Sequence, residues 1–184
     1  MYVAGKIFFT KGVGQHKEKL VSFELALRNA KIAPFNIVRV SSILPPHCKI
    51  VSLDKGLKEL KHGQVVHAVV AEASSNEHHR LMAAAVGVAI PKDKNRFGYL
   101  SEYHSFGDDE KTIGDYAEDL AAQMLATILG LDFDINQSYN ERLDQWKLSG
   151  QIVKTRNISQ ASIGKKKLWT TVVAAAVLVP PKKR

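Results

Sequence analysis

The chain has 184 residues and a mass of 20.4 kDa, a length that suits one domain and is sufficient to bury a hydrophobic core. Hydrophobic residues make up 45% and charged residues 24%, a composition that excludes an intrinsically disordered chain. The net charge of +8 permits an anionic partner without requiring one, and the single cysteine excludes an intrachain disulfide.

The sequence lacks the features of a membrane or secreted protein. Its longest apolar run, Trp169 to Val179, has about half of the ~20 residues that a bilayer-spanning helix needs. The residues from Met1 to Lys6 lack the order of regions that defines a signal peptide. Because Cys48 has no partner for a disulfide, a reducing compartment is favoured, and we expect a soluble cytoplasmic protein.

Strands predominate among the predicted elements. Alternating apolar and polar residues, or runs of β-branched and small residues, predict strands over residues 2–10, 35–40, 47–53, 64–73, 81–90, 96–103, 151–163 and 167–179. Residues 81–90 also fit a helix, but Gly87 and the following Pro91 favour a strand. Residues 11–19, with two glycines, are predicted to form a loop.

Helical spacing predicts helices over residues 20–32 and 108–130, with a shorter helical piece within 54–62. Ser22 is a candidate cap for the first helix, and Gly130 ends the longest one. Few helices among many strands favour an α+β fold in a single domain, 1–184, with 180–184 as a loose basic tail. We assign no role to the polar segment 132–150.

Most motifs of enzymes and metal sites are absent from the sequence. It has no Walker loop, GxGxxG, GxSxG, HExxH or paired CxxC. The neighbouring histidines His78 and His79 point apart and have no third ligand at a suitable spacing, so we expect no metal. No stripe of basic and aromatic residues suited to stacking bases is present, so we expect no nucleic-acid partner.

The segment Val40-Ser-Ser-Ile-Leu-Pro-Pro46 is unusual because two serines end a strand directly before two prolines. Serine and proline are common in turns, so a strand end followed by a turn explains the pattern. A self-processing site explains it as well, because a serine hydroxyl held against the preceding carbonyl can attack it. The pattern alone leaves both interpretations open.

The chain resembles the pyruvoyl-dependent arginine decarboxylases over about residues 2–179. The resemblance is carried by the stretches 22–32, 36–46, 88–94 (Val-Ala-Ile-Pro-Lys-Asp-Lys), 98–103 (Gly-Tyr-Leu-Ser-Glu-Tyr) and 167–179. It implies a four-layer αββα sandwich, assembled as a homotrimer of αβ protomers. It further implies cleavage between Ser41 and Ser42, which yields a β chain, 1–41, and an α chain, 42–184, that begins with a pyruvoyl group formed from Ser42.

The resemblance also implies roles for three other residues. Asn36 matches an asparagine that stabilises the oxyanion during processing, and Glu102 matches the acid beside the pyruvoyl group. Glu24 stands where members of the family have an aspartate that faces the substrate guanidinium. Glutamate is one methylene longer than aspartate, and a site that binds a guanidinium through two hydrogen bonds is sensitive to that length. Lysine and ornithine therefore stay open as substrates.

The function implied is the conversion of L-arginine to agmatine and CO₂, a step of polyamine biosynthesis. A pyruvoyl ketone forms a Schiff base with the amino acid and accepts the electrons that decarboxylation releases. The product must then be protonated, which Glu102 can do if burial raises its pKa. The alternative is a basic binding module of the same fold without a working pyruvoyl group, which the charge of +8 would suit.

Overall fold

The computed structural model describes residues 2–130 and 152–181. Over these residues the chain forms three helices, α1 (Lys19–Asn29), α2 (Leu53–Leu57) and α3 (Glu110–Leu129). It also forms nine strands, β1 (Lys6–His16), β2 (Asn36–Arg39), β3 (Ile43–Leu44), β4 (Lys49–Val51), β5 (Val65–Ser75), β6 (Leu81–Pro91), β7 (Gly98–Phe106), β8 (Ile152–Ile163) and β9 (Trp169–Val179). The expected polar segment 132–150 and most of the basic tail lie outside the described residues.

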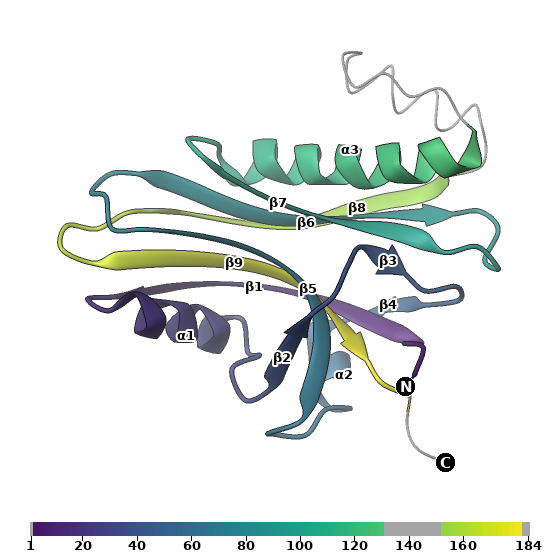
Figure 1. Ribbon diagram of the computed structural model, residues 1–184, viewed down its shortest axis with the longest axis horizontal. Coiled ribbons are helices and arrows are strands. Elements are labelled where there is room, and N and C mark those ends of the chain that lie inside the picture. The colour runs from purple at the N-terminus through teal and green to yellow at the C-terminus, as the bar shows by residue number, and fades with distance from the viewer. Residues whose placement is uncertain (1, 131–151, 182–184) are drawn as a thin grey trace.

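The elements stack in four layers (Figure 1). Helix α3 covers one face of a four-stranded sheet, a five-stranded sheet packs on the other face of that sheet, and α1 covers the far side. The predicted α+β class and the αββα order are therefore confirmed. None of the helices in the described part of the chain combines the length and the hydropathy that crossing a membrane requires.

The two edge strands β2 and β3 lie in different sheets. The five-stranded sheet has the order β2-β5-β9-β1-β4, in which β2–β5 and β1–β4 are parallel and the other pairs antiparallel. The four-stranded sheet has the antiparallel order β3-β7-β6-β8. Only residues 40–42 separate β2 from β3, so the chain passes from one sheet to the other at Ser41 and Ser42.

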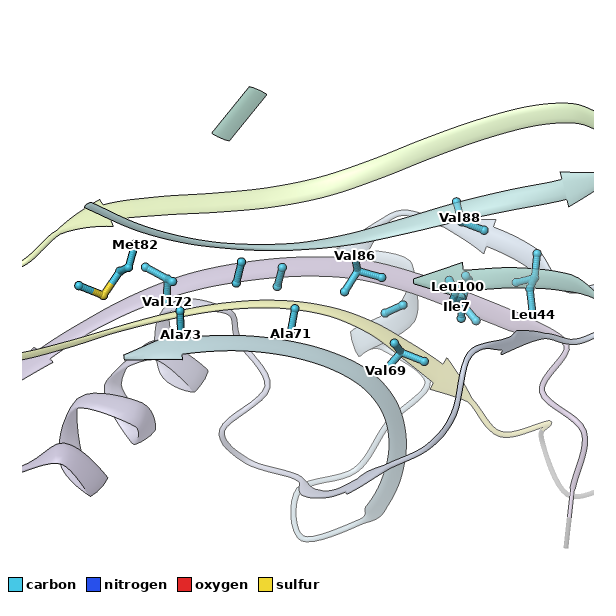
Figure 2. Packing of buried hydrophobic residues seen from close by; sticks show 13 residues of the cluster. Ile7, Leu44, Val69, Ala71, Ala73, Met82, Val86, Val88, Leu100 and Val172 are labelled. Atoms are coloured by element: carbon cyan, nitrogen blue, oxygen red, sulfur yellow. The ribbon is translucent and has the colours of Figure 1, made fainter. Parts of the chain in front are cut away.

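Small and β-branched side chains fill the space between the sheets (Figure 2). Because such side chains are short, the two sheets approach closely and leave little room for an internal cavity. Thirteen buried residues form this cluster: Ile7, Leu44, Val69, Ala71, Ala73, Met82, Ala84, Val86, Val88, Leu100, Val172, Ala174 and Ala176. Leu44 and Leu100 belong to β3 and β7, so the cluster extends to the strands beside Ser42.

The loop predicted at residues 11–19 is wrong, because β1 continues to His16. A Cβ atom on Gly12 would lie 2.2 Å from the Ala26 carbonyl oxygen, and one on Gly14 would lie 2.0 Å from the Ser22 carbonyl oxygen. The two glycines therefore allow α1 to lie directly on β1, a tertiary requirement that resembles a turn signal in the sequence.

Ser22 is not the cap of α1, contrary to the prediction. The helix begins at Lys19, and Ser22 is buried inside it, where its hydroxyl donates to the Lys19 carbonyl oxygen at 2.7 Å and contacts Thr171 Oγ1 at 2.7 Å. The longest helix, in contrast, follows its local signals. Asp109 caps α3 by accepting from the Thr112 N–H at 2.7 Å, and Gly130 ends it in the left-handed conformation.

Gly87 is the point on β6 where α3 comes closest. A Cβ atom there would lie 2.2 Å from the Ala117 carbonyl oxygen of the helix backbone. We expect Gly87→Ala to displace α3 and to lower stability by about 3 kcal/mol, or roughly 10 °C in Tm. Thermal unfolding measures the change, and Gly5→Ala, where nothing lies within 4 Å of the added carbon, is the matched control. Equal Tm values for the two variants would contradict the prediction.

Candidate active site

The peptide bond between Ser41 and Ser42 joins the two sheets. On one side, the Val40 N–H donates to the Ala68 carbonyl oxygen at 3.1 Å and extends the ladder between β2 and β5. On the other side, the Leu100 N–H of β7 donates to the Ser42 carbonyl oxygen at 2.7 Å. The residue before Ser41 is thus bonded to the five-stranded sheet and Ser42 to the four-stranded sheet, so the Ser41–Ser42 peptide bond connects the two sheets.

The backbone around Ser42 makes a tight turn. The Ile43 N–H donates to the Ser41 carbonyl oxygen at 3.1 Å, two residues back along the chain. This carbonyl is the one that the Ser42 hydroxyl would attack in a self-cleavage reaction. A donor already directed at its oxygen can stabilise the negative charge that develops there.

Glu102 lies beside Ser42, although 60 residues separate the two in sequence. The Ser42 hydroxyl donates to Glu102 Oε2 at 3.4 Å, near the upper limit for a hydrogen bond. Glu102 lies on β7, opposite Val86 of β6, and its carboxylate lines a cavity of about 280 Å³ with Arg39 and Glu72. The side chain is exposed, so the burial expected for an acid catalyst does not occur within one chain.

Asn36 is not brought to Ser42 within this chain. It is the first residue of β2, and its side-chain amide donates to the Gly63 carbonyl oxygen at 2.9 Å. The strand then runs about 10 Å to Arg39, at the ~3.3 Å per residue of an extended chain, before it reaches the serines. Asn36 instead lines a groove of about 680 Å³ between α1 and β2.

Glu24 also lies away from Ser42. It is on α1, close to the groove that contains Asn36, and its carboxylate pairs with the Arg28 guanidinium one turn later at 2.5 Å. Glu24, the predicted partner of the substrate guanidinium, is therefore already paired with the guanidinium of Arg28 in this chain. Of the five predicted site residues, the structure brings Ser41, Ser42 and Glu102 together, whereas Asn36 and Glu24 have other partners within this chain.

An ion pair that the sequence analysis missed connects these two regions. Arg39 of β2 and Glu72 of β5 pair at 2.5 Å, and both line the Asn36 groove and the Glu102 cavity. The groove and the cavity thus meet at this pair. No local pattern indicates it, because the contact depends on the parallel pairing of β2 with β5.

Cys48 lies in the turn that follows Ser42 and lines a different cavity. Burial raises the pKa of its thiol to about 11, although a hydrogen bond with Lys49 lowers it. At pH 8 a thiol with this pKa forms about a hundredfold less thiolate than a thiol with the ordinary pKa of 9.0.

We therefore expect iodoacetamide to alkylate Cys48 in the folded protein about a hundredfold more slowly than in the denatured chain, with the rate rising up to about pH 11. Equal rates for the two forms at pH 8 would contradict this.

The chain is similar to known proteins over nearly its whole length. A family model described as pyruvoyl-dependent arginine decarboxylase matches residues 6–183. A probable pyruvoyl-dependent arginine decarboxylase of Chlorobium phaeovibrioides is 56% identical over 97% of this chain and 99% of that protein. Pyruvoyl-dependent arginine decarboxylase 2 of Methanosarcina acetivorans is 54% identical, and the pyruvoyl-dependent arginine decarboxylase of Nitrosopumilus maritimus is 52% identical, each over 96% of this chain and 97% of the relative. This chain therefore belongs to the pyruvoyl-dependent arginine decarboxylase family.

Proposed function

We propose that this chain is a self-processing decarboxylase that converts L-arginine to agmatine and CO₂. The observation that carries the proposal is the Ser41–Ser42 bond, which links the two sheets beside the Glu102 carboxylate. The full-length similarity to proteins named pyruvoyl-dependent arginine decarboxylase supports arginine as the substrate.

Processing begins when Ser42 Oγ attacks the Ser41 carbonyl carbon while the Ile43 N–H donates to its oxygen. The C–N bond breaks, the hydroxyl proton passes to the nitrogen, and an ester joins the two halves. Loss of the Ser42 α-proton then breaks the Cβ–Oγ bond, which releases Ser41 as a carboxylate and leaves dehydroalanine. Addition of one water and loss of one ammonia turn dehydroalanine into the pyruvoyl group, with no net oxidation.

The residues around position 42 fit a pyruvoyl group. The carbonyl that follows the ketone would keep its hydrogen bond from the Leu100 N–H, and Glu102 would lie beside the reacting carbon. When bound to an amino acid, the group supplies an electron sink for the departing CO₂. The proton that replaces CO₂ then comes from Glu102, whose carboxyl must hold it until that step.

A second copy of the chain completes the proposed site. Glu102 is exposed in one chain, and Asn36 and Glu24 lie on another surface. The groove beside Asn36 is lined by apolar side chains of α1, among them Leu20, which is 77% exposed. A homotrimer of αβ protomers would bury this surface and bring Glu24 and Asn36 of one copy to Ser42 and Glu102 of the next. Burial of Glu102 in that contact would favour its protonated form.

The proposed enzyme works in the cytoplasm on a small-molecule substrate. Its single cysteine, which has no partner for an intrachain disulfide, suits a reducing compartment. The net charge of +8 is compatible with this assignment, because the proposed site contains the carboxylates of Glu24, Glu72 and Glu102.

The intact mass of the purified protein under denaturing conditions tests processing. We expect two chains, 1–41 and 42–184, the second lighter by one ammonia than a chain that starts with serine. A single chain that persists after long incubation would favour the binding-module alternative.

A panel of arginine, lysine, ornithine, histidine and aspartate tests the substrate. We expect CO₂ release from arginine, with agmatine identified by mass spectrometry. Release from lysine or ornithine in place of arginine would reassign the substrate, and release from aspartate alone would contradict the role of Glu24.

A further inference from the structure

A cavity of about 470 Å³ opens beside Ser41, and Glu102 is not among the residues that line it. Its walls come from the N-terminal segment, from β5 and β9, and from the two prolines after β3. Among the residues that line it, polar side chains come from Tyr2, Ser41 and His67, and none is a carboxylate, a lysine or an arginine. The mechanism proposed above does not use this cavity.

The cavity lies where the new end of the β chain would remain after cleavage. Val40 is held by the Ala68 carbonyl oxygen in the five-stranded sheet, whereas Ser42 is held by Leu100 in the four-stranded sheet. When the bond between Ser41 and Ser42 breaks, Ser41 therefore stays with the first sheet. His67 directly precedes Ala68 on β5, so its side chain lies on the opposite face of the strand, the face that is turned toward the other sheet.

Tyr2 fixes the imidazole of His67 in this cavity. The phenol oxygen lies 2.9 Å from His67 Nδ1, and the two rings are 5.5 Å apart. Burial raises the pKa of Tyr2, so the phenol keeps its proton and can donate to Nδ1. A neutral imidazole that accepts at Nδ1 carries its own proton on Nε2, which is then a hydrogen-bond donor.

We infer that His67, oriented by Tyr2, binds the carboxylate that Ser41 acquires when the chain is split. The inference rests on the proposed self-processing and extends it. Elimination breaks the Cβ–Oγ bond and leaves the electron pair on the Ser41 carboxylate, so a donor at this carboxylate stabilises the leaving group as well as the product. His67 touches the reacting group in this scheme, and Tyr2 is a positioning residue.

The test compares His67→Leu, His67→Gln and Tyr2→Phe with the native chain. We expect His67→Leu to slow the release of the β chain about tenfold or more, since a hydrogen bond to a charged group is lost. The ester should accumulate and be trapped by hydroxylamine as a hydroxamate on Ser41. His67→Gln retains a donor and should restore most of the rate, and Tyr2→Phe should give an intermediate effect. Tyr116→Phe, on the surface of α3, is the matched control.

A second measurement separates carboxylate binding from a general effect on folding. His67→Leu is also made in Ser42→Ala, which has no Ser41 carboxylate. We expect the substitution to lower Tm by about 5 °C more in the split protein than in the uncut one. Equal losses in the two backgrounds, with an unchanged rate of β-chain release, would overturn the inference while leaving the proposed function intact. A native chain that is never split would overturn both.

Discussion

Replacing Ser42 with alanine is expected to leave the protein as one uncut chain without decarboxylase activity. The substitution removes the only side-chain oxygen that can attack the Ser41 carbonyl from the following residue, so no ester and no pyruvoyl group can form. It removes no buried contact of the core and one long hydrogen bond to Glu102, so the fold should persist. Intact mass and agmatine production from arginine measure the two effects.

Ser41→Ala is the matched control for this experiment. The neighbouring serine contributes its carbonyl to the reaction, which alanine supplies equally well, so this variant should be split and active. Cleavage of Ser42→Ala at the same bond, or a Ser41→Ala chain that stays whole, would contradict the assignment of Ser42 as the nucleophile.

Local sequence signals were sufficient where an element depends on its own residues. Helix α3 follows its capping residues, Asp109 at one end and Gly130 at the other, and the strand favoured for residues 81–90 is β6. They failed where a residue serves a neighbouring element. Gly12 and Gly14 predict a loop, but their missing side chains make room for α1, and Ser22 lies inside that helix rather than at its start.

The candidate site was predictable only through the family resemblance. The pattern of two serines and two prolines is explained by a simple turn as well as by self-processing, and nothing in the sequence relates Ser42 to a glutamate 60 residues later. Their proximity follows from the pairing of β3 with β7. The ion pair between Arg39 and Glu72 depends in the same way on strand pairing, so no local pattern could reveal it. The roles of Asn36 and Glu24 stay predictions.

Glu102→Gln is expected to lower kcat for arginine about 100- to 10,000-fold while the chain is still split. The amide oxygen of glutamine can accept the hydrogen bond that Ser42 now donates to Glu102 Oε2, so the geometry needed for processing is retained. The amide cannot supply the proton that replaces CO₂, so the loss should fall on kcat with little change in KM.

Intact mass and steady-state kinetics on the same sample separate the two possible roles of Glu102. Glu77→Gln, at an exposed turn where Glu77 pairs only with the nearby Arg80 among the described ion pairs, is the matched control and should keep the native kcat. A split Glu102→Gln protein with native kcat would contradict the role in proton transfer. A variant that stays whole would instead assign the carboxylate to cleavage, because the step that fails would then precede any contact with substrate.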